Sequence, residues 1–188
     1  MFAALVPPPE AVADLDAFWE VRRAAAPFRW VAAEQLHLTL AFYAAVPERS
    51  LDDLVEWLER AAGRRTPFEA RVAGGGAFPH AAGARVLWAG LDTPERDELD
   101  RLAAGARAAA SRAGVAVDGQ RFRPHLSVAR LGRPGEVTAW VRLLDTYAGP
   151  AWTVDTLTLL ASYLGQGPRG RPRYEVVGEF PLAAPRVV

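Results

Sequence analysis

The chain has 188 residues and contains no cysteine, lysine, asparagine or isoleucine. The lack of cysteine excludes disulfides, thiolate metal sites and a cysteine nucleophile. Because lysine is missing, all 22 basic residues are arginines, so any cationic contact to a phosphate comes from a guanidinium, which can bond two oxygens at once. The formal net charge is zero, which excludes an overall basic field that attracts long nucleic acid.

Histidine is also scarce. The three histidines do not show the His-x-x-x-His spacing that is typical of a metal site, so we expect neither a metal nor another cofactor. The apolar stretch Met1–Val6 lacks a basic flank and is followed by three prolines, which indicates neither a signal peptide nor a membrane span. We therefore expect a cytoplasmic protein that makes no contact with a membrane, and we expect it to be a monomer.

Two of the three histidines open the same short motif: histidine, leucine, hydroxyl residue, aliphatic residue. The copies are His37-Leu38-Thr39-Leu40 and His125-Leu126-Ser127-Val128. Serine and threonine together number only 12, so two such matches by chance have a probability on the order of one per cent. An extended strand turns residues i and i+2 to one face, so each copy presents an imidazole beside a hydroxyl. Two converging copies predict a pocket for acid–base chemistry on a phosphate. The alternative is a pair of half-buried histidines bonded to backbone.

The hydrophobic pattern changes between the periods of strands and helices along the chain. Strands are predicted near residues 1–6, 28–31, 36–43, 68–72, 85–91, 122–131, 154–164 and 174–182. Helices are predicted near residues 10–25, 51–62, 94–113 and 136–146. The glycine-rich residues 74–80 are predicted to form a flexible loop, and residues 165–172 an exposed basic loop that could guide an RNA end or simply be solvated.

The order of these elements repeats, since each half runs strand, helix, histidine strand, helix, strand. We therefore predict an α+β fold and a single bilobal domain over residues 1–188, with an internal duplication into approximate halves 1–80 and 81–188. Two pseudo-symmetric lobes, each an antiparallel sheet with helices on its outside, would face each other across an active-site cleft. The alternative is a loose similarity of element order, which is common among α+β chains.

At these motifs the chain resembles the 2H phosphoesterases, which are marked by two His-x-Thr/Ser-x motifs. More narrowly, it resembles the bacterial RNA 2′,3′-cyclic phosphodiesterases, also called LigT-type or 2′-5′ RNA ligase-like proteins. The segment Phe122–Arg130 carries the strongest resemblance, and Arg29–Val31 fits the approach to the first motif. The chain departs from the family at Phe42-Tyr43-Ala44, where Phe-Leu-Gly is usual, and at Ser127, where threonine is common.

The resemblance implies a LigT-like fold and metal-independent hydrolysis of a 2′,3′-cyclic phosphate to a 2′-phosphomonoester. The substrate would be an RNA 3′ end or a small cyclic nucleotide. The resemblance makes His37 the proton donor and His125 the proton acceptor. Independently, histidine suits both roles because its pKa lies near neutrality. Thr39 and Ser127 are the candidate substrate-binding donors to the phosphate oxygens.

Arg130 is a further candidate for substrate binding. Its strand parity is opposite to that of His125 and Ser127, so it reaches the site only if the strand twists or ends there. The alternative is an arginine on the surface or between the lobes. Two other functions also stay open: a 2H phosphoesterase that acts on another cyclic nucleotide or on ADP-ribose cyclic phosphate, and a non-catalytic module that binds nucleotide or RNA.

Three aromatic residues near the motifs have two interpretations. Phe42, Tyr43 and Phe78 could stack on a base, as aromatic side chains do with single-stranded RNA, or pack in the core. His80, the third histidine, lies among glycine and proline with no hydroxyl two residues on, and is predicted to be a solvated loop residue.

Overall fold

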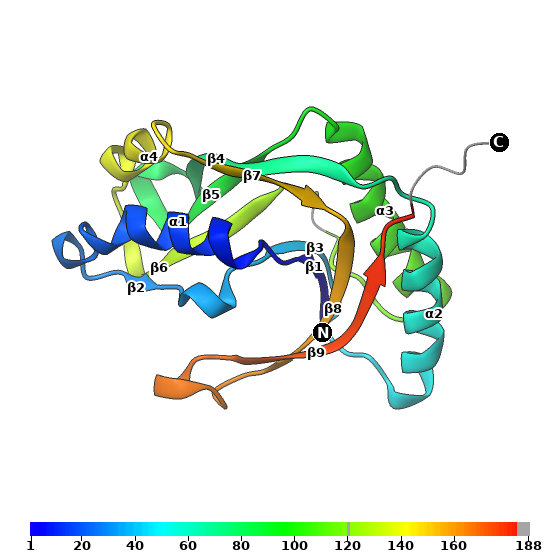
Figure 1. Cartoon of the computed structure of the whole chain (residues 1–188). Helices are drawn as coiled ribbons and strands as arrows, with labels where there is room; N and C mark the ends of the chain where they lie inside the picture. The colour runs from blue at the N-terminus through cyan, green and yellow to red at the C-terminus, as the bar shows by residue number, and fades with distance from the viewer. Residues whose placement is uncertain (120, 184–188) are drawn as a thin grey trace.

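Figure 1 shows the computed structural model of the chain, which describes residues 1–119 and 121–183. Within these residues, nine antiparallel strands form one curled sheet, and four α-helices pack against it. The strands are β1 (Phe2–Leu5), β2 (Arg29–Trp30), β3 (Leu38–Phe42), β4 (Phe68–Phe78), β5 (Ala84–Asp92), β6 (His125–Gly135), β7 (Ala148–Val154), β8 (Thr156–Tyr163) and β9 (Arg173–Pro181). The helices are α1 (Pro9–Glu20), α2 (Leu51–Ala62), α3 (Arg96–Arg112) and α4 (Thr138–Leu144).

The strands of the sheet fall into two sets, called its two sides below, which meet where the histidine strands β3 and β6 are neighbours. The strand order is β7-β4-β5-β6-β3-β1-β8-β9, and β2 pairs with β6. Helix α1 packs against β7 and β4, and α4 against β4 and β5, whereas α3 covers β3 and packs on α2, which reaches β9 (Figure 1). The α+β class with antiparallel strands and outer helices is thus confirmed, and the two lobes are the two sides of one continuous sheet.

Each side of the sheet has four strands in the main strand order, with the histidine strand at the centre of the sheet. From the centre outward, one side runs β6, β5, β4 and β7, and the other runs β3, β1, β8 and β9. Each side draws strands from both parts of the chain, because β4 lies beside β5, while β8 lies beside β1 and β9 lies beside β8. The duplication into halves 1–80 and 81–188 stays a prediction.

Both histidine strands carry a β-bulge at the same place in their motif. In β6, Ser127 pairs with Trp88 but Ala129 pairs with Leu87, which leaves Val128 as the extra residue. In β3, Thr39 and Ala41 pair with consecutive residues of β1, which leaves Leu40 as the extra residue. A bulge shifts the side-chain alternation by one position, so two consecutive residues are buried in each strand after the hydroxyl.

One prediction about the strands is wrong, and one strand was missed. Residues 74–78 are not a loop, because β4 continues through them to Phe78. The glycines allow close packing there: a Cβ on Gly75 would lie 2.5 Å from Leu144 Cδ1, and a Cβ on Gly76 would lie 2.4 Å from Trp88 Cζ2. The sequence analysis also missed β7, a mostly exposed strand of seven residues that pairs with the long β4.

The buried face of the sheet and the helices share one large apolar core. Leu38 and Leu126 are 1% and 0% exposed, and they pair directly where β3 meets β6. Among the described residues, no helix is long and apolar enough to cross a membrane. The expected cytoplasmic location and monomeric state stay predictions.

The central leucine pair provides a test of what holds the two sides together. Leu126→Ala removes a fully buried side chain and leaves a cavity, so we expect the free energy of unfolding to fall by about 2–5 kcal/mol in urea denaturation. Val21→Ala, at a position that is 79% exposed, is the matched control and should change it by less than about 0.5 kcal/mol. Equal small effects of both substitutions would contradict the central role of this pair.

Candidate active site

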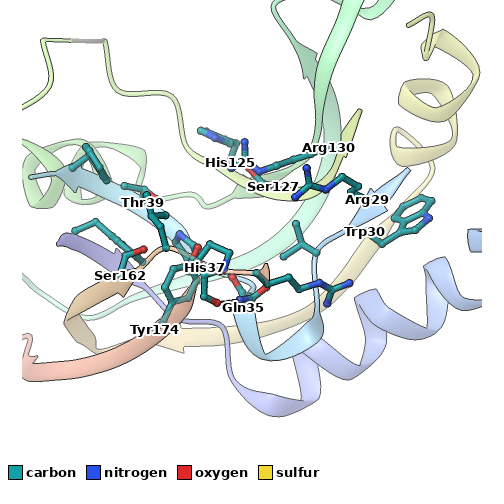
Figure 2. A pocket seen from close by; sticks show the side chains of 16 residues that line it. Arg29, Trp30, Gln35, His37, Thr39, His125, Ser127, Arg130, Ser162 and Tyr174 are labelled. Carbon is teal, nitrogen blue, oxygen red and sulfur yellow. Dashed lines mark hydrogen bonds between the residues drawn. The ribbon is translucent and has the colours of Figure 1, made fainter. Parts of the chain in front are cut away.

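A pocket of about 440 Å³ opens where β3 and β6 meet (Figure 2). It contains all five residues that the sequence analysis named as candidates: His37, Thr39, His125, Ser127 and Arg130. The remaining walls come from β1, β2, the short 3₁₀ turn Ala33–Gln35, and the hairpin between β8 and β9. Residues from distant parts of the chain thus form one concave site.

The register of the central pair sets the arrangement of the four chemical groups. Leu38 pairs with Leu126 in antiparallel fashion, so His37 lies opposite Ser127 and Thr39 lies opposite His125. Alternation along each strand turns these four side chains to the pocket and the two leucines to the core. Each imidazole therefore has a hydroxyl beside it on its own strand and another across the strand pair.

The two imidazoles are oriented by the same type of hydrogen bond. His37 Nδ1 lies 2.8 Å from the carbonyl oxygen of Gln35, and His125 Nδ1 lies 2.7 Å from that of Arg123. A carbonyl oxygen only accepts, so Nδ1 donates and carries a proton in both the neutral and the charged ring. This leaves Nε2 of each ring available to accept a proton from a ligand or to donate one.

Aromatic side chains hold both rings in place. Phe2 stacks on His37 with centroids 4.6 Å apart, and Tyr174 meets the same ring edge-on at 5.3 Å. Phe78 and Trp88 contact the His125 ring at 4.8 and 6.1 Å. Sequence analysis gave none of these side chains this role, because they come from other strands and no local pattern joins them to the motifs. Such packing limits ring motion while Nε2 stays available.

Burial lowers the pKa of His37, while its hydrogen bond to Gln35 opposes this change and the positive charges of His125 and Arg130 lower the pKa further. Burial likewise lowers the pKa of His125, against its bond to Arg123, and Arg130 adds to the lowering. Both rings are therefore neutral at pH 7 in the empty pocket. A bound phosphate would raise both pKa values, because an anion favours the charged imidazole.

The bulge at Val128 explains how Arg130 reaches the pocket. Without a bulge, Arg130 would point away from the face that holds His125 and Ser127. The extra residue reverses the alternation, so Arg130 lines the same pocket (Figure 2). The equivalent bulge in β3 brings Phe42, 46% exposed, to the pocket as well.

The other residues named from sequence lie elsewhere. Tyr43 is buried and its hydroxyl donates to the Ala106 carbonyl at 3.0 Å, so it packs in the core and does not stack on a base. Phe78 supports His125 from outside the pocket lining. His80 is exposed, as expected, and it does not line the pocket. Over residues 1–119 and 121–183, no three His, Cys, Asp or Glu side chains cluster as metal ligands would.

A family model for the 2′-5′ RNA ligase superfamily matches residues 7–166. The chain belongs to this superfamily. An RNA 2′,3′-cyclic phosphodiesterase of Thermus thermophilus is 34% identical over 190 residues, covering 96% of this chain and 88% of that protein. One of Geobacillus stearothermophilus is 30% identical over 159 residues, and the aligned region covers 83% of this chain but only 48% of that longer relative.

The fold agrees with this membership. The crystal structure of E. coli LigT complexed with 3′-AMP has a TM-score of 0.78 and 28% identity to this chain, and the match covers 96% of both chains. The resemblance to the 2H phosphoesterases and to LigT-type proteins is therefore confirmed for the family and for the fold.

The electrostatics of the pocket can be tested by histidine NMR titration. We expect His37 and His125 to titrate below 6.5, and Arg130→Gln to raise both midpoints because it removes a positive charge near both rings. Arg133→Gln, an exposed change on the same strand outside the pocket, should leave both midpoints unchanged. Midpoints that do not respond to Arg130→Gln would contradict its position.

The lowered histidine pKa values also affect stability. Folding lowers both pKa values, so below pH 6.5 the unfolded chain binds more protons than the folded one. The free energy of unfolding should therefore fall as the pH drops from 6.5 toward the folded pKa values, and this contribution should level off below them. Urea denaturation of the wild type and of a His37→Gln, His125→Gln double variant would measure it as the pH dependence that the variant lacks.

Proposed function

We propose that this chain hydrolyses 2′,3′-cyclic phosphates, at RNA 3′ ends or in 2′,3′-cyclic nucleotides, to 2′-phosphomonoesters with its two histidines as acid and base. The observation that carries this proposal is the meeting of two imidazoles and two hydroxyls in one pocket, with both Nε2 atoms available. The superfamily relatives are named RNA 2′,3′-cyclic phosphodiesterase, and the chain is a cyclic phosphodiesterase of their type.

The reaction assigns one proton transfer to each ring. Neutral His125 accepts a proton from water through Nε2 as the water oxygen bonds to phosphorus. Protonated His37 donates from Nε2 to the 3′-oxygen as the P–O3′ bond breaks. The product carries a phosphate on O2′ and a free 3′-hydroxyl, and the protons balance because one ring gains what the other loses. The direction of the two roles follows from the family resemblance.

Thr39 and Ser127 are suited to stabilise the transition state. Their hydroxyls lie beside the imidazoles on the pocket face, where they can donate to the non-bridging phosphate oxygens as negative charge develops. Arg130 lines the same pocket and adds a fixed positive charge. In this scheme the proton transfers and the charge stabilisation come from protein side chains, so no metal ion takes part.

Substitution of either histidine tests the proposal directly. His37→Ala and His125→Ala should each lower kcat on 2′,3′-cyclic nucleotides by about 10²–10⁴-fold, because each removes one proton transfer. EDTA should have no effect on the wild-type rate. His80→Ala is the matched control, since it removes the exposed third histidine and should retain full activity. Near-normal rates in either active-site variant would rule the mechanism out.

The pH profile is a second test. Catalysis needs one neutral and one protonated imidazole, so activity should be bell-shaped in pH. Both pKa values are lowered in the empty pocket, so the optimum of kcat/KM should lie below 6.5. The optimum of kcat should lie at higher pH, because the bound phosphate raises both pKa values in the complex. Two coincident profiles would contradict this electrostatic coupling.

The alternative functions predict different results in the same assays. A phosphoesterase for another cyclic phosphate would hydrolyse ADP-ribose cyclic phosphate faster than cyclic-phosphate RNA. A binding module would hold the cyclic phosphate intact for hours. The pair of titratable imidazoles in one pocket favours turnover over binding alone, because binding does not need two groups that can exchange protons.

A further inference from the structure

The pocket is lined by cationic side chains without a carboxylate. Arg29, Arg130 and Arg171 line it, and no aspartate or glutamate occurs among its described lining residues. None of these three guanidiniums forms a salt bridge to a described carboxylate, whereas Arg60, Arg96 and Arg101 on the outer helices each have acidic partners. The pocket therefore holds two arginines besides Arg130, the one that the proposed mechanism uses.

Arg29 and Arg130 are direct partners across two antiparallel strands. Arg29 pairs with Arg130; in the next pair, Ala129 is buried, and Trp30 packs against the core and also lines the pocket. Both arginines are exposed on the pocket face, where Figure 2 draws them next to each other. Like charges in directly opposite positions repel, so this pair lowers stability unless an anion lies between or beside the guanidiniums.

The position of Arg29 separates it from the reacting phosphate. Strand β6 pairs with β3 at Leu126 and with β2 at Ala129 and Arg130. Arg130 is four residues beyond Leu126, and one of these is the bulged Val128, so at about 3.3 Å per residue Arg29 lies roughly 10 Å along β6 from the central leucine pair. Arg130 is near enough to both imidazoles to act on them. Arg29 lies on β2, which shares one edge of β6 with β3, and it is not among the charges that shift the pKa of either histidine.

A second hollow continues from the pocket at this point. It shares Arg29, Trp30, Val31 and Arg171 with the pocket and leads away over the 3₁₀ turn Ala33–Gln35. Its other charged residues are Asp16, Arg23 and Glu34, of which Asp16 and Arg23 pair with each other. Arg29 on β2 and Arg171 on the β8–β9 hairpin both belong to the two hollows, so they line the passage between them.

We infer that Arg29 and Arg171 form an outer subsite for the phosphate on the 5′ side of the terminal cyclic nucleotide. The inference rests on the proposed function, since it extends the same site by one phosphate. In an RNA this group is the phosphodiester that joins the last nucleotide to the chain; in a free nucleotide it is a 5′-phosphomonoester. Both are anions that a guanidinium binds through two oxygens. The subsite makes the enzyme prefer substrates with this second phosphate.

Three substrates test the subsite: a 2′,3′-cyclic nucleotide with a free 5′-hydroxyl, the same nucleotide with a 5′-phosphate, and a short RNA ending in the cyclic phosphate. Arg29→Gln and Arg171→Gln should each lower kcat/KM about 10-fold on the second and third substrates, since each loses a charged hydrogen bond. On the first substrate the change should stay within about twofold. Arg133→Gln is the control and should match wild type throughout.

The outcomes separate the subsite from the proposed function. If the wild type hydrolyses none of the three substrates, the proposed function fails. If it hydrolyses all three and both variants match it, only the subsite is overturned. An equal loss on all three substrates also overturns the subsite, because the arginines would then serve the reacting phosphate or the fold. A loss on the RNA alone assigns the subsite to the diester of a chain, and a loss on both phosphorylated substrates assigns it to the 5′-phosphate itself.

Two further readouts do not depend on the catalytic step. On the RNA, the slope of log kcat/KM against log salt should be smaller by about 0.7 in Arg29→Gln, as expected for one lost phosphate contact on a single strand. Without ligand, Arg29→Gln should raise Tm by about 1–3 °C because it relieves repulsion with Arg130. A lower Tm together with an unchanged salt slope would show that Arg29 serves the fold and would overturn the subsite.

Discussion

The site depends on the pairing of two buried leucines where the two sides of the sheet meet. Leu38 and Leu126 are almost fully buried and directly opposite each other. Since side chains alternate along a strand, a slip of one residue in this register would turn a histidine and a hydroxyl into the core. The loss of apolar burial opposes such a slip, so packing on one face of the sheet maintains the chemistry on the other.

Two bulges determine which further side chains line the pocket. Val128 and Leu40 are the extra residues in β6 and β3, and each comes directly after the hydroxyl of its motif. After the bulge, one strand presents Arg130 to the pocket and the other presents Phe42. The backbones of the two histidine strands are therefore alike, but their side chains differ, because β6 adds a cation to the pocket and β3 adds an aromatic ring. Under the proposed function, this asymmetry would favour one orientation of a nucleotide, which has a charged end and an aromatic end.

The pocket combines neutral imidazoles with fixed positive charge. Burial keeps the pKa of both rings low, and the nearby arginine lowers both further. A bound phosphate reverses this effect, so substrate binding and proton uptake are coupled. In the proposed mechanism, the protonated imidazole that acts as the acid would therefore form when an anion occupies the pocket. The protonation states of the two imidazoles therefore depend on the bound anion as well as on the protein.

Periodicity and the two rare motifs determined much of this protein from sequence alone. All four helices were predicted, although α1 ends at Glu20 and α3 begins at Arg96, and all five candidate residues named from the sequence line the pocket. Alternation within one strand is local, so His37 with Thr39 and His125 with Ser127 could be paired without coordinates. Only the tertiary structure decided which strands are neighbours, where the bulges fall, and that Phe2, Tyr174 and Arg29 join the site. These depend on contacts between distant segments, which no local pattern encodes.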